Sequence, residues 1–247
     1  MLLDLKKLAV LLSKEPVLTY KMQYQIFHHP LGKEAILWFH ERAAMMLDHS
    51  LYMYGDEDVL DGFLAQLEPG QEYYFFGVQV KLLPLLAHHF YEIKRDEDCT
   101  AYTITPEDFA AHQPEILPLD SLRAADAEFV NTHWTYRHEG SLDFFKHIIA
   151  HYPSSAVRSS GKLVGWAVCY DAIPDMANLG SLRVLESHRN QGLGRKLAAD
   201  LVQKVLNLGK VPLAHILDNN IPSKTLSMGI GFKPYPEQIF WGSGVKK

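Results

Sequence analysis

The residues best suited to chemistry form the hexapeptide Arg189-Asn190-Gln191-Gly192-Leu193-Gly194. Its two glycines leave the main chain uncovered, so that a ligand can lie against the backbone N–H groups. The residues from 195 to 208 repeat apolar side chains at helical spacing, namely Leu197, Leu201, Val205 and Leu208. Because the start of a helix attracts anions, this turn predicts a cradle for a diphosphate.

The elements around the turn follow from the neighbouring residues. A β-rich run at 179–185 comes before it, and Gly209 ends the helix that comes after it. A buried strand is expected over Val211–Leu217, followed by a helix that Asn220 caps. The turn lacks the Lys-Ser/Thr ending of a nucleotide P-loop and the third glycine of the dinucleotide fingerprint, which excludes both of those sites.

The pattern R-x-x-G-x-G between a strand and an amphipathic helix resembles the acetyl-CoA-binding turn of the GCN5-related N-acetyltransferases (GNAT superfamily). A second signature of that family is similar to the run from Asn220 through Ser223 to Gly231-Phe232. The resemblance implies that acetyl-CoA or another acyl-CoA is the co-substrate. It assigns the following residues to binding it, with Leu182 and Val184 acting through the main chain: Leu182, Arg183, Val184, Arg189, Asn190, Gln191, Gly192, Leu193, Gly194, Arg195, Asn220 and Ser223. Ordinary helix capping is the alternative for Asn220 and Ser223.

Residues 118–235 resemble more narrowly the glycine N-acyltransferase-like, FR47-like branch of this superfamily. The likeness lies in the run D-A-x-x-V-N-x-x-W from Asp126 to Trp134, the Gly165-Trp166 pair and the strand histidine His215. It implies transfer of an acyl group to the amino group of glycine, another amino acid or a small amine. By position, Asn131 and Trp134 would lie on a helix pair that covers this acceptor. Core packing explains both residues equally well.

Catalysis by such an enzyme requires that the acceptor amine lose a proton. In many relatives a Glu on the opened strand serves as the base, and Asn178 occupies that place here. Among the alternatives, Asp175 and His215, we prefer His215, because the ordinary pKa of imidazole, near 6.5, suits a base at neutral pH. A core histidine is the competing interpretation. Ser227 stands where relatives have a tyrosine acid, so a non-catalytic acyl-CoA-binding protein is the alternative function.

The chain is expected to form two α/β domains. Prolines at 106, 114 and 118 indicate a linker, which gives a non-catalytic domain at 1–110 and a GNAT acyltransferase domain at 111–247. The resemblance implies a mixed, mostly antiparallel sheet with flanking helices in the second domain, and possibly a degenerate copy in the first. Residue patterns in the first domain predict helices at 2–12, 33–47, 57–67 and 82–91, and strands at 73–80 and 99–105.

Composition limits the partners. A net charge of −5 without a basic run argues against nucleic acid, and the lack of an eighteen-residue apolar run argues against a membrane span. Two isolated cysteines, Cys99 and Cys169, fit a cytoplasmic protein and buried positions. No metal is expected, because the adjacent pairs His28-His29 and His88-His89 should point to different faces, and His147 and His151 lack a third ligand. We expect a monomer or homodimer.

Overall fold

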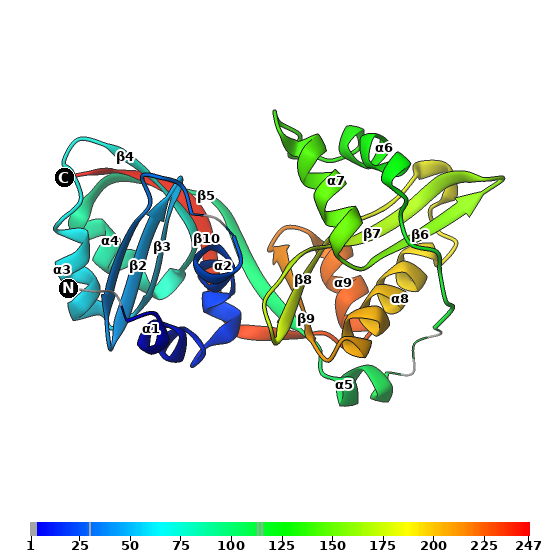
Figure 1. Ribbon diagram of the computed structural model, residues 1–247, viewed down its shortest axis with the longest axis horizontal. Coiled ribbons are helices and arrows are strands. Elements are labelled where there is room, and N and C mark those ends of the chain that lie inside the picture. Colours follow the sequence, from blue (N-terminus) through cyan, green and yellow to red (C-terminus); the bar gives the residue numbers. More distant parts are fainter. Residues whose placement is uncertain (1–3, 30, 113, 115) are drawn as a thin grey trace. The chain divides into compact units, whose positions relative to one another are not determined.

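The computed structural model describes residues 4–29, 31–112, 114 and 116–247. The chain forms two compact units (Figure 1). The first contains Met1–Ala101, Leu217–Asn219 and Tyr235–Lys247, and the second contains Tyr102–Ile216 and Asn220–Pro234. The chain therefore enters the second unit earlier than residue 111, and its last segment belongs to the first unit.

The proline-containing stretch near residue 110 packs into the second unit. It forms α5 (Pro106–Ala111), and the Thr105 hydroxyl caps this helix by accepting the Asp108 N–H at 3.1 Å. Phe109 is buried in one core with Ile104 and Phe232. A stretch whose aromatic side chain is buried in a core does not act as a linker, which explains why the boundary differs from the predicted one.

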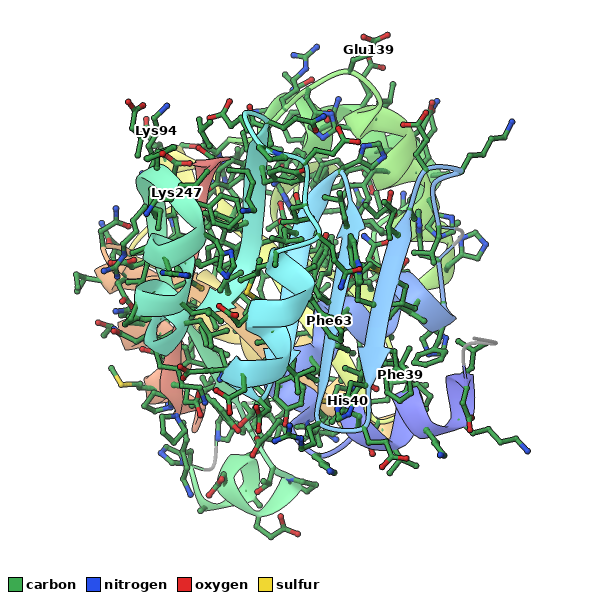
Figure 2. The ribbon with its side chains drawn as sticks, turned by 90° about the vertical axis from the view of Figure 1, so that its left-hand side faces the viewer. Phe39, His40, Phe63, Lys94, Glu139 and Lys247 are labelled. Carbon is green, nitrogen blue, oxygen red and sulfur yellow. The ribbon has the colours of Figure 1, made fainter. Side chains whose placement is uncertain are left out.

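The first unit contains paired strands with helices on their faces. In sheet order the strands are β1 (Ile36–His40), β2 (Ala43–Asp48), β3 (Ser50–Gly55), β4 (Glu72–Gln79), β10 (Lys233–Lys246) and β5 (Phe90–Thr103). The helices are α1 (Leu5–Leu12), α2 (Pro16–Phe27), α3 (Glu57–Leu64) and α4 (Leu83–His89). Figure 2 shows α3 and α4 lying across one face of the strands. Phe63 of α3 packs against the hydrophobic core that these helices and strands share.

The helix predicted at 33–47 is wrong, because these residues form the β1–β2 hairpin, in which His40 pairs with Ala43. Strand β2 explains the error. Its odd residues, Ala43 and Met45, are buried in one core, and its even residues, Ala44 and Met46, are buried in another. A strand that is buried on both faces shows no alternation of apolar and polar residues, so its pattern resembles that of a helix.

The second unit is a mixed α/β structure. Its strands lie in the order β9 (Val211–Leu217), β8 (Met176–Val184), β7 (Lys162–Ala172) and β6 (Ser154–Ser159). The pairs β6–β7 and β7–β8 are antiparallel, whereas β8–β9 is parallel. Besides α5, its helices are α6 (Ala127–Thr132), α7 (Ser141–His151), α8 (Leu193–Asn207) and α9 (Ile221–Gly229).

Helices pack on both faces of this second sheet. Trp166 and Val168 of β7 share a core with residues of α6 and α7. Their neighbour Ala167 packs with Leu197 and Leu201 of α8. Alternate residues of one strand therefore serve two helical layers, as the period of two in a strand requires.

A buried carboxylate attaches α8 to the edge of the sheet. Asp200 is buried, accepts the Ser155 hydroxyl at 2.6 Å and forms an ion pair with Lys204 at 2.7 Å. The Lys204 ammonium also donates to the carbonyl oxygens of Leu119 and Ser154, both at 2.9 Å. A buried charge must be paired to be tolerated, so this network fixes where α8 lies and hence where it begins.

Within the part of the chain that the structure describes, no helix is both long and apolar enough to cross a membrane.

Candidate functional site

The two parallel strands of the second unit separate after a short paired segment. The β8–β9 register pairs Met176 with Val211, Ala177 with Pro212 and Asn178 with Leu213, and among the described residues it goes no further. Beyond that point β8 continues to Val184, paired only with β7, and β9 continues to Leu217. One edge of β8 thus leaves main-chain polar groups open to another partner. We call this separation the fork.

A β-bulge changes the direction of β8 in the part that is not paired with β9. Val168 pairs with Gly180 but Trp166 pairs with Arg183, so that two residues, Ser181 and Leu182, oppose one residue of β7. Ser181 has a φ of 43°, in the left-handed region that non-glycine residues seldom adopt. The bulge turns Leu182 outward, where its side chain is 38% exposed.

Tyr170 of β7 holds the bulge in place. A Cβ added to Gly180 would lie 2.1 Å from Cε2 of Tyr170, so the phenol ring occupies the space above this glycine. The Tyr170 hydroxyl forms hydrogen bonds with Trp134 and Ser181. Burial raises the pKa of Tyr170, which keeps this hydroxyl protonated at neutral pH. The roles of Tyr170, Gly180 and Ser181 were missed from the sequence, although Gly180 inside a predicted strand is a signal for a bulge.

The glycine turn leads from β8 into α8 and leaves the start of that helix uncovered. Gly192 is the N-cap residue with a φ of 74°, and no side chain in the described ranges caps the helix. A Cβ on Gly192 would meet no described atom within 4 Å. The main-chain N–H of Lys196 donates to the Gly192 carbonyl at 3.2 Å, which is the first hydrogen bond of the helix. The N–H groups before it have no carbonyl acceptor within the helix. The N–H groups of Leu193, Gly194 and Arg195 can therefore bind an anion.

Gly194 lies where the elements of the site converge. A Cβ at this position would lie 3.8 Å from Leu182 Cδ2 of β8 and 3.9 Å from Leu226 Cδ2 of α9. Both distances are ordinary van der Waals contacts. The start of α8 is thus adjacent both to the open strand edge and to α9.

Arg189, the first residue of the motif, contacts the protein itself. Its Nε donates to the Val184 carbonyl at 3.2 Å, and its Nη1 lies 3.4 Å from Glu186 Oε1. The side chain therefore braces the turn against the end of β8. It also occupies the Val184 carbonyl, one of the main-chain groups expected to meet the ligand.

The second signature begins with a helix cap, as the alternative interpretation of Asn220 anticipated. Asn220 Oδ1 accepts the Ser223 N–H at 3.2 Å at the start of α9. Asn220 is exposed and Ser223 is half-buried. The cap uses the Asn220 oxygen and leaves its amide NH₂ group exposed.

The two residues predicted to cover an acceptor contribute to packing. Asn131 on α6 is 6% exposed, and its Oδ1 accepts the Ser141 hydroxyl of α7 at 2.7 Å. Trp134 stacks on Phe144, with ring centres 6.0 Å apart, and meets Phe145 edge-on at 5.3 Å. Trp134 lies beyond the end of α6 at Thr132, not on the helix as predicted. These contacts fasten α6 and the residues after it to α7, in agreement with the core-packing interpretation. Contact with an acceptor stays a prediction.

The candidate catalytic residues lie at or near the fork. Asn178 belongs to the last β8–β9 pair, and His215 comes two residues after its partner Leu213, on the separated part of β9. His215 is half-buried. Ser227 lies in α9, where its carbonyl accepts the N–H groups of Ile230 and Phe232.

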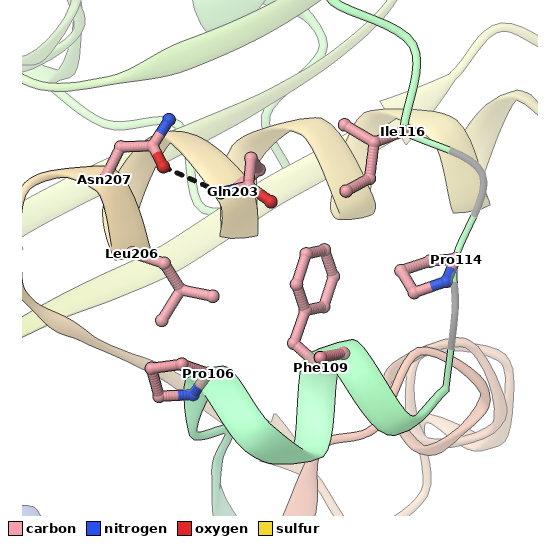
Figure 3. A pocket seen from close by; sticks show the side chains of 8 residues that line it. Pro106, Phe109, Pro114, Ile116, Gln203, Leu206 and Asn207 are labelled. Carbon is pink, nitrogen blue, oxygen red and sulfur yellow. Dashed lines mark hydrogen bonds between the residues drawn. The ribbon is translucent and has the colours of Figure 1, made fainter.

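A cavity of about 430 Å³ lies elsewhere in the second unit, between α5 and α8 (Figure 3). Its lining is mainly apolar and consists of Pro106, Phe109, Ala110, Pro114, Ile116, Gln203, Leu206 and Asn207. Gln203 is ten residues beyond Leu193 on α8, which is about 15 Å along a helix. The cavity is therefore separate from the glycine turn.

Both cysteines are buried, as expected of small apolar side chains. Burial raises the pKa of Cys169 to about 12, so its thiol is protonated at neutral pH and unsuited to act as a nucleophile.

Comparison with known proteins gives one family match. Residues 156–241 match the model of the FR47-like protein family. This stretch holds the fork, the glycine turn and both predicted signatures. None of the curated proteins compared with the chain matches it.

Solved structures share the fold at low sequence identity. A Drosophila protein of known X-ray structure has a TM-score of 0.68 and 19% identity, over 97% of this chain and 95% of that one. An acetyltransferase of the GNAT family from Colwellia psychrerythraea has a TM-score of 0.59 and 14% identity, over 98% of both chains. A GCN5-related N-acetyltransferase from Kribbella flavida has the same TM-score and identity, over 92% of this chain and 93% of that one. The fold is therefore that of the GNAT acetyltransferases, and with the FR47-like match it supports the resemblance to that superfamily.

Proposed function

We propose that the protein is an acyl-CoA-dependent N-acyltransferase. It would move an acetyl or other acyl group from acyl-CoA to the amino group of a small amine or amino acid, by direct attack in a ternary complex. The observation that carries the proposal is the convergence at Gly194. There an uncapped helix start meets the open edge of a separated strand.

Acyl-CoA suits the chemistry of both parts. The diphosphate would accept hydrogen bonds from the N–H groups of Leu193, Gly194 and Arg195, helped by the positive end of α8. Pantetheine carries amides, which would pair with the main chain of β8 beyond Asn178, as a peptide pairs with a strand edge. The exposed amide of Asn220, and Ser223 beside it, would contact the same arm from α9.

The reaction forms a C–N bond and breaks a C–S bond. The amine attacks the thioester carbonyl carbon, loses one proton, and the CoA thiolate leaves and gains a proton. An amine with a pKa of about 10.4 needs about 4.6 kcal/mol to lose its proton at pH 7, whereas protonating the thiolate gains only about 2 kcal/mol. The base therefore matters more than the acid.

His215 would accept the amine proton. It lies on the separated part of β9, next to where the thioester would enter, and imidazole exchanges protons near neutral pH. Asn178 cannot take a proton but would orient the amine or a water. Ser227 is too weak an acid to replace a phenol and would hold a water beside the leaving thiolate.

A non-catalytic acyl-CoA-binding protein is the second candidate, and the residues at positions 178 and 227 favour it. Neither an amide nor a serine hydroxyl is a strong proton carrier. Such a protein would keep the helix start and the fork and would release no thiol.

A thiol-release assay separates the two candidates. The intact protein is mixed with acetyl-CoA or longer acyl-CoAs and a panel of amino acids and polyamines, and free CoA thiol is measured. The enzyme predicts thiol release that requires both the protein and one class of amine. Tight CoA binding without amine-dependent release would overturn the enzyme and leave the binding protein.

A further inference from the structure

A cluster of three metal-ligating side chains lies in the first unit. Asp61 is on α3, and His88 and His89 are the last two residues of α4. One ligand atom from each residue lies within 4.8 Å of the other two. The cluster belongs to neither the glycine turn nor the fork.

The expectation that adjacent histidines point to different faces is wrong for His88 and His89. Neighbouring residues on a helix are about 100° apart around its axis, so they need not face opposite sides. Their ring centres are 5.1 Å apart and their planes are nearly perpendicular, at 89°. Asp61, on the preceding helix α3, supplies the third ligand atom of the cluster.

Within the cluster, the buried His89 is held in place and the exposed Asp61 can adjust. The His89 side chain is 8% exposed, and its Nε2 lies 2.8 Å from Asp61 Oδ1. The His89 carbonyl also accepts the Lys247 N–H at 2.8 Å, which anchors the end of α4. The Asp61 side chain is 51% exposed and can therefore move toward a bound ion.

The donor set suits a transition metal better than a hard cation. Imidazole nitrogen and carboxylate oxygen bind Zn²⁺ at about 2.0–2.2 Å, whereas Ca²⁺ and Mg²⁺ prefer oxygen ligands only. Tetrahedral coordination at that radius places donors about 3.4 Å apart, between the 2.8 Å pair and the 4.8 Å limit seen here. With neutral imidazoles the cluster carries one negative charge, which a divalent cation offsets.

We propose that Asp61, His88 and His89 form a binding site for a divalent transition-metal ion, with Zn²⁺ the best match to the ligands. Water completes the coordination on the exposed side. The ion ties α3 to α4 and so stabilises the first unit. The proposal does not rest on the proposed acyltransferase activity.

The test is a calorimetric titration of the intact, chelator-treated protein with ZnCl₂. The wild type is expected to bind one ion per chain in a saturable step. His88→Ala, at an exposed position, is expected to weaken binding at least tenfold. Asp61→Asn keeps an oxygen that can accept a hydrogen bond from His89 but removes the charge, and it should weaken binding to a similar degree.

His151→Ala is the matched control. His147 and His151 on α7 form another close histidine pair, which stacks with ring centres 4.4 Å apart. Removing His151 should leave zinc affinity unchanged if the site is on α3 and α4. Three results would each overturn the proposal: no saturable binding by the wild type, binding as tight as that of the wild type by both cluster variants, or loss of binding in His151→Ala.

A second readout identifies the geometry. Co²⁺ in place of Zn²⁺ should give the strong visible absorption of a four-coordinate site in the wild type and lose it in His88→Ala. A spectrum that is unchanged by this substitution would contradict the assignment, provided that circular dichroism shows the variant to be folded.

Discussion

The second unit has two sides that the sequence marked as functional, and they differ in how their polar groups are used. On the α8 side, Gly192 begins a helix without a side-chain cap, and β8 leaves β9 after Asn178. On the α6–α7 side, Asn131 is hydrogen-bonded to Ser141 and Trp134 is packed between aromatic rings. One side has groups available to a ligand, and the other uses its groups to hold the fold.

This difference separates stability from binding. A hydrogen-bonding group that already has a buried partner contributes to folding, and its loss leaves that partner unsatisfied. A group without a partner contributes little to folding until a ligand arrives. Substitutions on the α8 side should therefore change ligand affinity, and those on the α6–α7 side should change the free energy of unfolding.

The largest effect is expected from Gly192→Asp. A carboxylate at the start of α8 would repel a diphosphate and compete for the same N–H groups, so the Kd for CoA should rise more than a hundredfold, about 2.8 kcal/mol. Gly192→Asn is the matched control, because Asn has the same shape without the charge and also tolerates a positive φ. It should weaken binding less than tenfold. If calorimetry gave the Asp variant and the wild type the same Kd for CoA, the start of α8 would not be the site that binds the diphosphate.

His215→Ala should lower the acyl-transfer rate at saturating acyl-CoA by roughly a hundredfold, the usual loss for a general base. CoA affinity should stay within about twofold, because the imidazole would act on the amine proton and not on the diphosphate. The wild-type rate should fall at acidic pH, because a protonated imidazole cannot accept the amine proton. The rate of the variant should not show this fall. His147→Ala, an exposed histidine on α7, is the control. A variant with the wild-type profile would exclude His215 as the base.

Asn131→Ala should lower the free energy of unfolding by about 2 kcal/mol, since it leaves the Ser141 hydroxyl without this partner. Urea unfolding measures the loss, and CoA affinity should be retained. Thr132→Ala, at the exposed neighbouring position, should change stability by less than about 0.5 kcal/mol. If Asn131→Ala left stability intact while lowering acceptor affinity, the two sides would not differ as described.

The smallest effect is expected from Asn220→Ala, which removes the cap of α9 and should cost about 1 kcal/mol of stability. The Kd for CoA should rise only a few-fold through loss of the exposed amide. Asn220→Ser keeps a capping oxygen and should restore most of the stability. A large loss of CoA affinity with unchanged stability would place Asn220 with the groups that serve the ligand.

Local features of the site were predictable from the sequence. Gly192 and the apolar repeat after it determine the turn and α8 through residues close together in the chain. The end of α9 at Gly229, shortly before Gly231-Phe232, and the strand Val211–Leu217 follow from equally local signals. The mixed sheet with flanking helices was predicted from the resemblance that these motifs carry.

Features that depend on distant partners were not predictable. The bulge at Ser181 needs the Tyr170 ring over Gly180, which becomes apparent only once β7 and β8 are paired. Strand β2 is buried on both faces, and that burial removed the alternation that would have marked it. The Asn131–Ser141 bond likewise required α6 and α7 to be placed.

The most direct test of the central claim is the change in backbone ¹⁵N–¹H chemical shifts when CoA is added to the labelled protein. The account predicts that the largest changes fall on the amides of Leu193, Gly194 and Arg195, with further changes on β8 beyond Asn178. Unchanged signals for these amides, together with shifts around Phe109 and Leu206 in the separate cavity, would contradict it.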